Sequence, residues 1–242
     1  MNESFFEGKE TKPIKYSVVI PVYNEEESLK SLFSELVQAL SPLKARYEII
    51  FVDDASDDTS PQIMEDFRKE FPEVVVLVRL PERSGQTFAM RQGLDKVLGE
   101  VAFTLDADLQ NDPADIPRLL EKMQEGNYDC VCGWRKSRND KALKAILSKT
   151  GNLLQRMCTG LSVHDVSCTL RAYKQHCLPH VTLHWEGQHR FIPLCLSLQG
   201  YKVGEIVSNH RSRQYGVSKY SHKRIFRVIT DFFRILKTGG KA

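Results

Sequence analysis

The 242-residue sequence contains no apolar run of the roughly 18 residues that a membrane-spanning helix requires. Its longest apolar stretches, such as Val74 to Val78, have the length of β-strands. The first 15 residues, MNESFFEGKETKPIK, lack the apolar core of a secretory signal. We therefore expect a chain that has no cleaved leader and does not cross a bilayer by itself.

The cysteines lack the patterns of a disulfide scaffold or a zinc finger. Six are present, and none forms a C-x-x-C pair or a zinc-finger spacing. We therefore expect reduced thiols in a cytosolic compartment. Cys130 and Cys132 are two residues apart, so they should share one face of a strand.

Charge of one sign is not in large excess. The formal net charge of +3 is too small to indicate a nucleic-acid partner, although the region from His210 to Lys241 is basic. With 41% hydrophobic and 27% charged residues, the composition is not that of a disordered or collagen-like chain. We expect one domain with a sizeable core.

From Tyr16 onward, short β-branched runs alternate with amphipathic segments. Helical patterns cover residues 28–40, the segment after Thr59, residues 84–97 and the segment that opens at Pro113. The strand-like runs are SVVIPVYN, YEIIFVDD, EVVVLVRL, VAFTLDAD and YDCVCGWR. This alternation predicts an α/β fold with a mostly parallel, Rossmann-like sheet flanked by helices.

The second half is less regular, and we expect it to complete the same domain. It contains an apolar segment at residues 191–198, the strand-like run YKVGEIVSNHR and a helical pattern at residues 221–236. No Gly/Pro/Ser-rich linker separates a second domain.

Polar residues follow several predicted strands, at the edge where parallel sheets bind ligands. The clearest group is Asp106-Ala107-Asp108, the only D-x-D in the chain. Two carboxylates at a strand end can hold a hard divalent cation against a diphosphate, and Gln110 offers a third oxygen. An all-oxygen set predicts Mg²⁺ or Mn²⁺. A solvated turn is the alternative, and Asp112 before Pro113 has the pattern of a helix cap.

Two further strand ends carry candidate nucleoside contacts. Asp54 could accept hydrogen bonds from a base or a ribose, whereas Asp57 and Asp58 fit a turn and a helix cap better. After the first strand, Tyr23 could lie against a base and Glu25 could bind a ribose or base, with a helix cap as the alternative. No glycine-rich phosphate loop follows this strand, which argues against NAD binding and P-loop chemistry.

Basic residues in the second half could bind phosphate. Arg213 and Lys219 lie on either side of Gly216, as suits a loop that folds over an anion; a solvated basic loop is the alternative. Arg135 and Arg138 follow the fifth strand and could bind either the diphosphate of a donor or the phosphate of an acceptor.

Taken in order, these motifs resemble the family-2 glycosyltransferases of the GT-A fold, in the branch of dolichol-phosphate mannosyltransferases and polyprenyl-phosphate glycosyltransferases. The resemblance spans Tyr16 to Tyr220 and rests on VVIPVYNEEESL, EIIFVDDASDD, LDADLQNDP, GWR and NHRSRQYGVSKY. It implies that a nucleoside pocket is lined by Pro21, Tyr23, Glu25, Val52 and Asp54. It implies metal ligands at Asp106, Asp108 and Gln110, contacts of Asp106 and Ala107 with the nucleotide sugar, and phosphate-facing cations at Arg135, Arg213 and Lys219.

The resemblance also implies a reaction. A sugar would move with inversion from GDP-mannose or a UDP-hexose to a polyprenyl or dolichyl phosphate, with Asp108 and Arg213 among the catalytic residues. A lipid phosphate is already an anion and needs no strong base. A hydroxyl acceptor would need one, and Asp165 is the candidate. A non-catalytic nucleotide-sugar-binding subunit is the third alternative. His164, Arg171 and His189-Arg190 match family segments near the acceptor or could be structural.

The resemblance and the C-terminal pattern together predict three parts: a polar extension at residues 1–15, the glycosyltransferase domain at 16–220, and an amphipathic basic helix with its tail at 221–242. The apolar face of this helix would lie on the cytoplasmic face of a membrane, bind a membrane-anchored partner subunit, or pack on the domain. That face comprises Ile225, Phe226, Val228, Ile229, Phe232, Phe233, Ile235 and Leu236.

Overall fold

The structure, a computed structural model, describes residues 13–136, 161–212 and 223–240, with the side chains of the last segment described from Thr230. Seven strands form one sheet in the order β3-β2-β1-β4-β6-β5-β7. Their bounds are β1 Tyr16–Val22, β2 Tyr47–Asp53, β3 Val75–Arg79, β4 Val101–Thr104, β5 Cys130–Trp134, β6 Arg171–Lys174 and β7 Val203–Val207. Only β6 runs antiparallel to its neighbours, β4 and β5. The expected mostly parallel sheet is confirmed.

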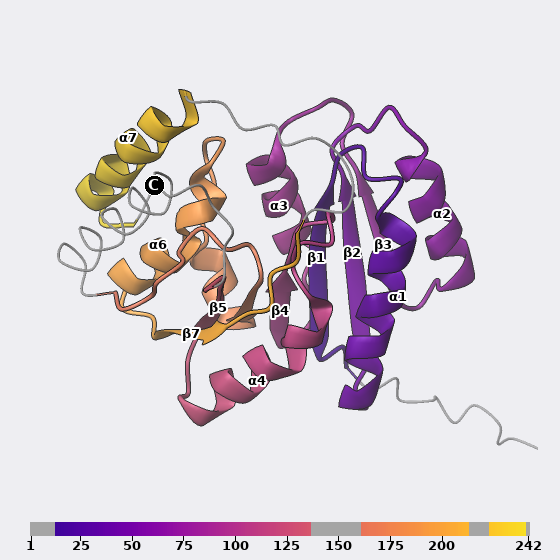
Figure 1. Ribbon diagram of the computed structural model, residues 1–242, viewed down its shortest axis with the longest axis horizontal. Coiled ribbons are helices and arrows are strands. Elements are labelled where there is room, and N and C mark those ends of the chain that lie inside the picture. Colours follow the sequence, from indigo (N-terminus) through magenta and orange to yellow (C-terminus); the bar gives the residue numbers. More distant parts are fainter. Residues whose placement is uncertain (1–12, 137–160, 213–222, 241–242) are drawn as a thin grey trace, which may run out of the picture.

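Helices cover both faces of the sheet (Figure 1). On one face, α1 (Leu29–Leu40), α2 (Ser60–Glu70) and α4 (Ile116–Glu125) contribute to one apolar core. On the other face, α3 (Gln86–Leu94), α6 (Ile192–Leu198) and α7 (Lys223–Thr238) contribute to a second. Short 3-10 turns are η1 (Ser41–Leu43), η2 (Pro113–Asp115), η3 (Gln175–His180) and η4 (Gln188–Phe191). Because both sheet faces are covered, the central strands β1 and β2 are almost continuously apolar.

The sheet has one strand that the sequence did not predict. β6 begins at Arg171, whose side chain is fully buried, and a charged residue at that position hides the strand pattern. Some helix boundaries also differ from expectation. α3 ends at Leu94 instead of residue 97, and the segment after Asp112 begins as the 3-10 turn η2 before α4.

The described cysteines are free thiols, and the predicted placement of Cys130 and Cys132 on one face of a strand is confirmed. Cys130 and Cys132 lie on the same side of β5, with sulfur atoms 3.9 Å apart, and both are buried free thiols. Burial also raises the pKa of Cys195 to about 11, which keeps that thiol protonated near neutral pH.

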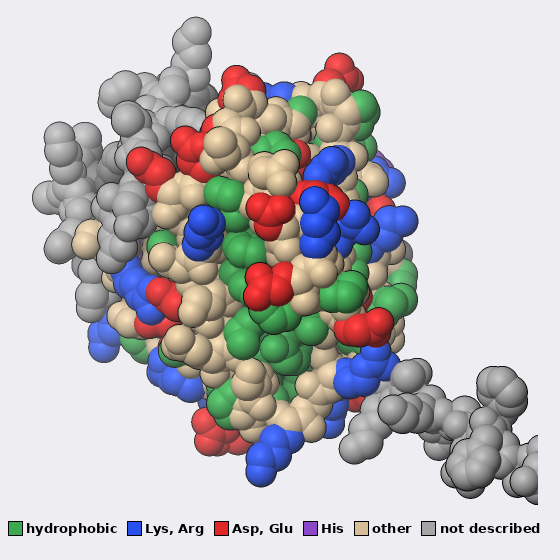
Figure 2. All heavy atoms as spheres, turned by 90° about the vertical axis from the view of Figure 1, so that its right-hand side faces the viewer, with side chains coloured by type: hydrophobic (Ala, Val, Ile, Leu, Met, Phe, Trp, Pro, Cys, Tyr) green, Lys and Arg blue, Asp and Glu red, His purple; other side chains and the backbone are tan. Residues whose placement is uncertain are grey.

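The surface beside edge strand β3 carries charges of both signs. Figure 2 shows Lys and Arg side chains next to Asp and Glu on the face that lies to the right in Figure 1, around a group of hydrophobic side chains. Arg68 and Arg79 both pair with Glu65 of α2. This face is therefore mixed in charge.

The described part of α7 packs on the domain. Phe232 is 8% exposed and Ile235 is fully buried in the second core, while Phe233 is 56% exposed. The guanidinium of Arg234 lies 4.1 Å from the ring centre of Trp185. For these residues the structure favours packing on the domain. No helix of the described residues is long and apolar enough to cross a membrane.

The two neighbouring phenylalanines of α7 give a matched test of this packing. Phe232→Glu places a charge in the core and should lower the free energy of unfolding by about 3 kcal/mol or more. Phe233→Glu changes an exposed side chain and should alter it by no more than about 0.5 kcal/mol. Urea unfolding of both variants checks this, and similar losses for the two would contradict the packing.

Candidate active site

The parallel register brings the predicted polar residues to one edge of the sheet. Val22 pairs with Asp53 and Val19 with Thr104, so the chain leaves β1, β2 and β4 at the same edge. β5 ends there as well, because it is antiparallel to β6, which is antiparallel to β4. Asp54, Asp106 and Arg135 each follow one of these strand ends.

Asp106 and Asp108 follow β4. Asp106 accepts hydrogen bonds from Gln86 Nε2 at 2.6 Å and from Thr169 Oγ1 at 2.7 Å. Asp108 is 8% exposed, and its Oδ1 accepts a hydrogen bond from the backbone N–H of Gln110 at 3.2 Å. Burial, and then the charge of Asp108, raise the pKa of Asp106. The donors to Asp106 are neutral, so they orient its charge without cancelling it.

This oxygen set fits a divalent cation. Asp106 and Asp108 place two carboxylates, two residues apart in the sequence, on a turn at the predicted ligand-binding edge, where Leu109 has a φ of 60°. A cation would relieve the repulsion between them. Ala107 is buried in the first core, so its side chain does not line the site. The expected cap is confirmed, since Asp112 accepts a hydrogen bond from Ala114 N at 3.0 Å.

A second cluster of possible ligands lies at the other edge of the sheet. Asp129, His176 and Cys177 have ligand atoms within 4.8 Å of one another. The ammonium of Lys174 lies 3.5 Å from Asp129, and Cys177 donates to the Asp129 carbonyl. These contacts join the start of β5 to the end of β6 and explain the cluster without a metal.

Asp54, one of the predicted nucleoside contacts, holds the turn before α3. Its carboxylate accepts hydrogen bonds from Ser84 N at 2.6 Å and Gly85 N at 2.9 Å. This turn places the guanidinium of Arg83 4.0 Å from the ring centre of Tyr23. The contact of Arg83 was not predicted from the sequence. The available signal was Gly85, because a glycine often marks a tight turn, and here it has a φ of +94° just before α3.

The other predicted nucleoside residues differ in burial. Val52 is fully buried against the second core, so it could meet a nucleoside only through its backbone. Pro21 and Glu25 are partly buried at and just beyond the end of β1. The N–H of Glu25 donates to Ser60 Oγ at 2.9 Å, which joins this turn to the start of α2.

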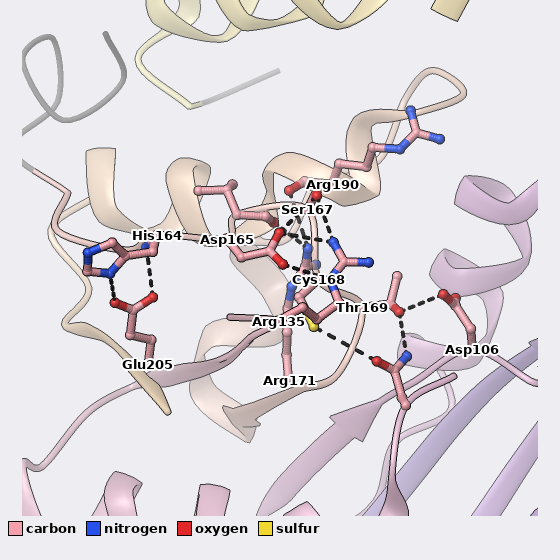
Figure 3. A network of polar contacts seen from close by, with 12 residues as sticks. Asp106, Arg135, His164, Asp165, Ser167, Cys168, Thr169, Arg171, Arg190 and Glu205 are labelled. Atoms are coloured by element: carbon pink, nitrogen blue, oxygen red, sulfur yellow. Dashed lines mark hydrogen bonds and ion pairs between the residues drawn. The ribbon is translucent and has the colours of Figure 1, made fainter. Parts of the chain in front are cut away.

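Arg135 is held by Asp165, as Figure 3 shows. Arg135 Nε lies 2.7 Å from Asp165 Oδ2, and Nη2 lies 3.0 Å from Asp165 Oδ1 and from Ser167 Oγ. Burial alone would lower the pKa of Arg135, but the hydrogen bond and charge of Asp165 raise it. Because both carboxylate oxygens accept from a cation, Asp165 is poorly placed to take a proton from a hydroxyl acceptor.

Arg171 organises the same region from inside the core. Its guanidinium donates to the carbonyl oxygens of Val166 and His189 at 2.7 Å and of Arg190 at 3.3 Å. His189 Nδ1 lies 2.6 Å from Thr87 Oγ1 on α3. Arg171 and His189 are therefore buried structural residues, as the alternative in the sequence analysis allowed.

His164 has partners on two sides. Its ring stacks on Trp134 with the ring centres 4.2 Å apart, and its Nδ1 pairs with Glu205 of β7. It therefore links the end of β5 to β7 beside the Asp165 loop (Figure 3).

Arg138, Arg213 and Lys219 lie outside the described residues. The segment just before Arg213 is anchored beside the D-x-D turn. Arg211 N donates to the Gln110 carbonyl at 2.9 Å, and its guanidinium lies 2.7 Å from both Glu35 and Asp112. This anchor was not predicted, because Glu35 and the turn of Gln110 and Asp112 both lie far from Arg211 in the sequence.

Comparison with known proteins agrees with this geometry. Residues 17–181 match the glycosyl transferase family 2 domain. An undecaprenyl-phosphate 4-deoxy-4-formamido-L-arabinose transferase of Pectobacterium carotovorum is 39% identical over 92% of this chain and 67% of its own length. A dodecaprenyl-phosphate galacturonate synthase of Rhizobium johnstonii is 35% identical over the same shares. The chain spans about two thirds of the length of these curated relatives.

Solved structures share the fold at low sequence identity. A Pyrobaculum calidifontis mannosyltransferase in complex with GDP-Man and Mn²⁺ has a TM-score of 0.67 at 18% identity, over 94% of this chain and 65% of that one. A Mycobacterium tuberculosis glucosyl-3-phosphoglycerate synthase with Mn²⁺, UDP-Glc and phosphoglyceric acid has a TM-score of 0.67 at 17% identity, over 93% and 80%. By sequence and by fold, the chain belongs to glycosyl transferase family 2, and it is a glycosyltransferase of the GT-A fold.

Proposed function

We propose that the protein transfers a sugar, with inversion, from a nucleotide diphosphate sugar to a polyprenyl phosphate in a reaction that requires Mg²⁺ or Mn²⁺. The observation that supports a nucleotide-sugar donor and a metal is the pair Asp106 and Asp108 at the carboxyl ends of the parallel strands. The relatives named for transfer to a polyprenyl phosphate support a polyprenyl phosphate as the acceptor. The proposed donor is GDP-mannose or a UDP-hexose.

Each group of the site has a role in this proposal. Asp106, Asp108 and Gln110 would hold the cation, which supplies positive charge beside the leaving diphosphate. Asp54, Tyr23 and the Arg83 turn would position the nucleoside. With both Nε and Nη2 engaged, Arg135 would present the remaining N–H groups of its guanidinium to a phosphate oxygen. Outside the described residues, Arg213 and Lys219 would add further positive charge there.

The Arg135–Asp165 pair favours a phosphate acceptor over a hydroxyl. A phosphate oxygen is already negatively charged and can attack the anomeric carbon without losing a proton. The carboxylate proposed as a base for a hydroxyl is instead committed to Arg135 through two hydrogen bonds. Reaching a lipid substrate would require the protein to meet the cytoplasmic face of a membrane or a membrane-anchored partner subunit.

A labelled-donor assay tests this proposal. The protein is mixed with Mn²⁺, undecaprenyl phosphate and, in turn, GDP-mannose and a panel of UDP-hexoses labelled in the sugar. We expect one donor to carry label into the organic phase, and EDTA to prevent this. Label that appears only in water-soluble saccharide would favour a hydroxyl acceptor, whereas donor binding without transfer to any acceptor would favour a non-catalytic subunit.

A further inference from the structure

The carboxylate of Asp106 is fixed by two neutral donors from distant parts of the chain. Gln86, the first residue of α3, donates to Oδ1 from one side, and Thr169, two residues before β6, donates to Oδ2 from the other. Because each oxygen accepts one of these bonds, rotation of the carboxylate would break both. One lone pair on each oxygen remains for a further contact.

Thr169 is itself held in place. The residue is only 6% exposed, and its hydroxyl accepts a hydrogen bond from Asn111 Nδ2 at 3.0 Å. Its carbonyl accepts a hydrogen bond from Thr104 Oγ1 at 2.7 Å, at the end of β4. Since Asn111 donates to the hydroxyl oxygen, the hydroxyl proton is directed to Asp106. Figure 3 shows the hydrogen bond from Thr169 to Asp106.

The chemistry of the donors matters as much as their position. Lys or Arg at either place would neutralise Asp106 and compete with a cation for its oxygens. An amide and a hydroxyl orient the carboxylate and leave its negative charge in place. Groups that orient metal ligands in this way typically change metal affinity or activity about 10- to 100-fold when they are removed.

We propose that Thr169 and Gln86 are positioning residues, which hold Asp106 in the orientation that binds the divalent cation together with Asp108. This inference rests on the metal dependence in the proposed function. Neither residue needs to touch the substrate, so their effect should appear first in metal affinity.

The test compares Mn²⁺ binding by wild type, Thr169→Val, Gln86→Leu and Thr169→Ser. Free Mn²⁺ is measured by electron paramagnetic resonance with saturating UDP or GDP present. We expect Thr169→Val and Gln86→Leu each to raise the Kd for Mn²⁺ about tenfold or more. Thr169→Ser keeps the hydroxyl and should remain within about threefold of wild type.

Thr182→Val is the matched control. It removes a buried threonine hydroxyl that has no hydrogen-bond partner among the described residues, so Mn²⁺ binding should not change. Circular dichroism confirms that each variant is folded. If Thr169→Val does not fold, Gln86→Leu still decides, because Gln86 is partly exposed at the start of α3.

Two outcomes separate the inference from the proposed function on which it rests. Folded Thr169→Val and Gln86→Leu variants that bind Mn²⁺ as wild type does would overturn the positioning role alone. A wild-type protein that binds no Mn²⁺ with either nucleotide would overturn the metal site, and the positioning role with it.

Discussion

Replacing Asp108 by asparagine is expected to lower the rate of sugar transfer about a thousandfold, which corresponds to about 4 kcal/mol of lost transition-state stabilisation. The change keeps the shape of the side chain but removes a charge that the proposed cation requires. The fold should remain stable, because burial of Asp106 and then repulsion from Asp108 raise the pKa of Asp106, and the asparagine removes that repulsion. Initial rates with saturating donor, together with urea unfolding, measure both effects.

Two controls accompany this variant. Asp66→Asn changes an exposed aspartate on α2, away from the strand ends, and should leave the rate unchanged. EDTA should abolish transfer by the wild type, and added Mn²⁺ or Mg²⁺ should restore it. An Asp108→Asn protein with near wild-type activity would show that the D-x-D turn does not hold the cation.

The second large effect is expected for Arg135→Leu, which should lower the free energy of unfolding by about 3–5 kcal/mol and abolish transfer. The side chains of Arg135 and Asp165 are only 13% and 11% exposed. Removing the guanidinium alone therefore leaves a buried carboxylate without its cation. Stability is measured by urea unfolding and transfer by the labelled-donor assay.

The double variant Arg135→Leu/Asp165→Leu separates the two losses. With both charges gone, much of the stability should return, because no unpaired charge remains buried. Transfer should stay absent, because the phosphate-facing cation is missing. Recovery of activity in the double variant would argue that Arg135 only holds the Asp165 loop and has no part in the reaction.

The sequence predicted those features that depend on local patterns. β-Branched runs such as VVIPV and EIIFVD identified buried parallel strands, since both faces of the sheet are covered. Asp106 and Asp108 could be recognised because they directly follow one of these runs. Asp54 and Arg135 could be assigned to the same edge for the same reason.

Contacts between distant segments could not be predicted in this way. Most hydrogen-bond partners of the Arg171 guanidinium are backbone carbonyls, which no side-chain pattern reveals, so β6 remained hidden. Arg83 reaches Tyr23 only because Asp54 holds the turn before α3. The pairing of Arg135 with Asp165 likewise depends on how the second half folds back. The assignments of Arg213 and Lys219 stay predictions.

The reversed strand β6 has a consequence for the order in which the chain folds. β1, β2 and β3 are joined by connections that each contain one α-helix, so their pairing closes fairly short loops. The contacts that hold the segments around Asp106 and α3 together span more of the chain. They join residues 63 apart for Thr169 and Asp106, and 102 apart for Thr87 and His189. Loop closure costs more entropy as sequence separation grows. The β1–β3 part of the sheet should therefore form first, and a nascent chain should acquire an oriented Asp106 only after β6 has inserted between β4 and β5.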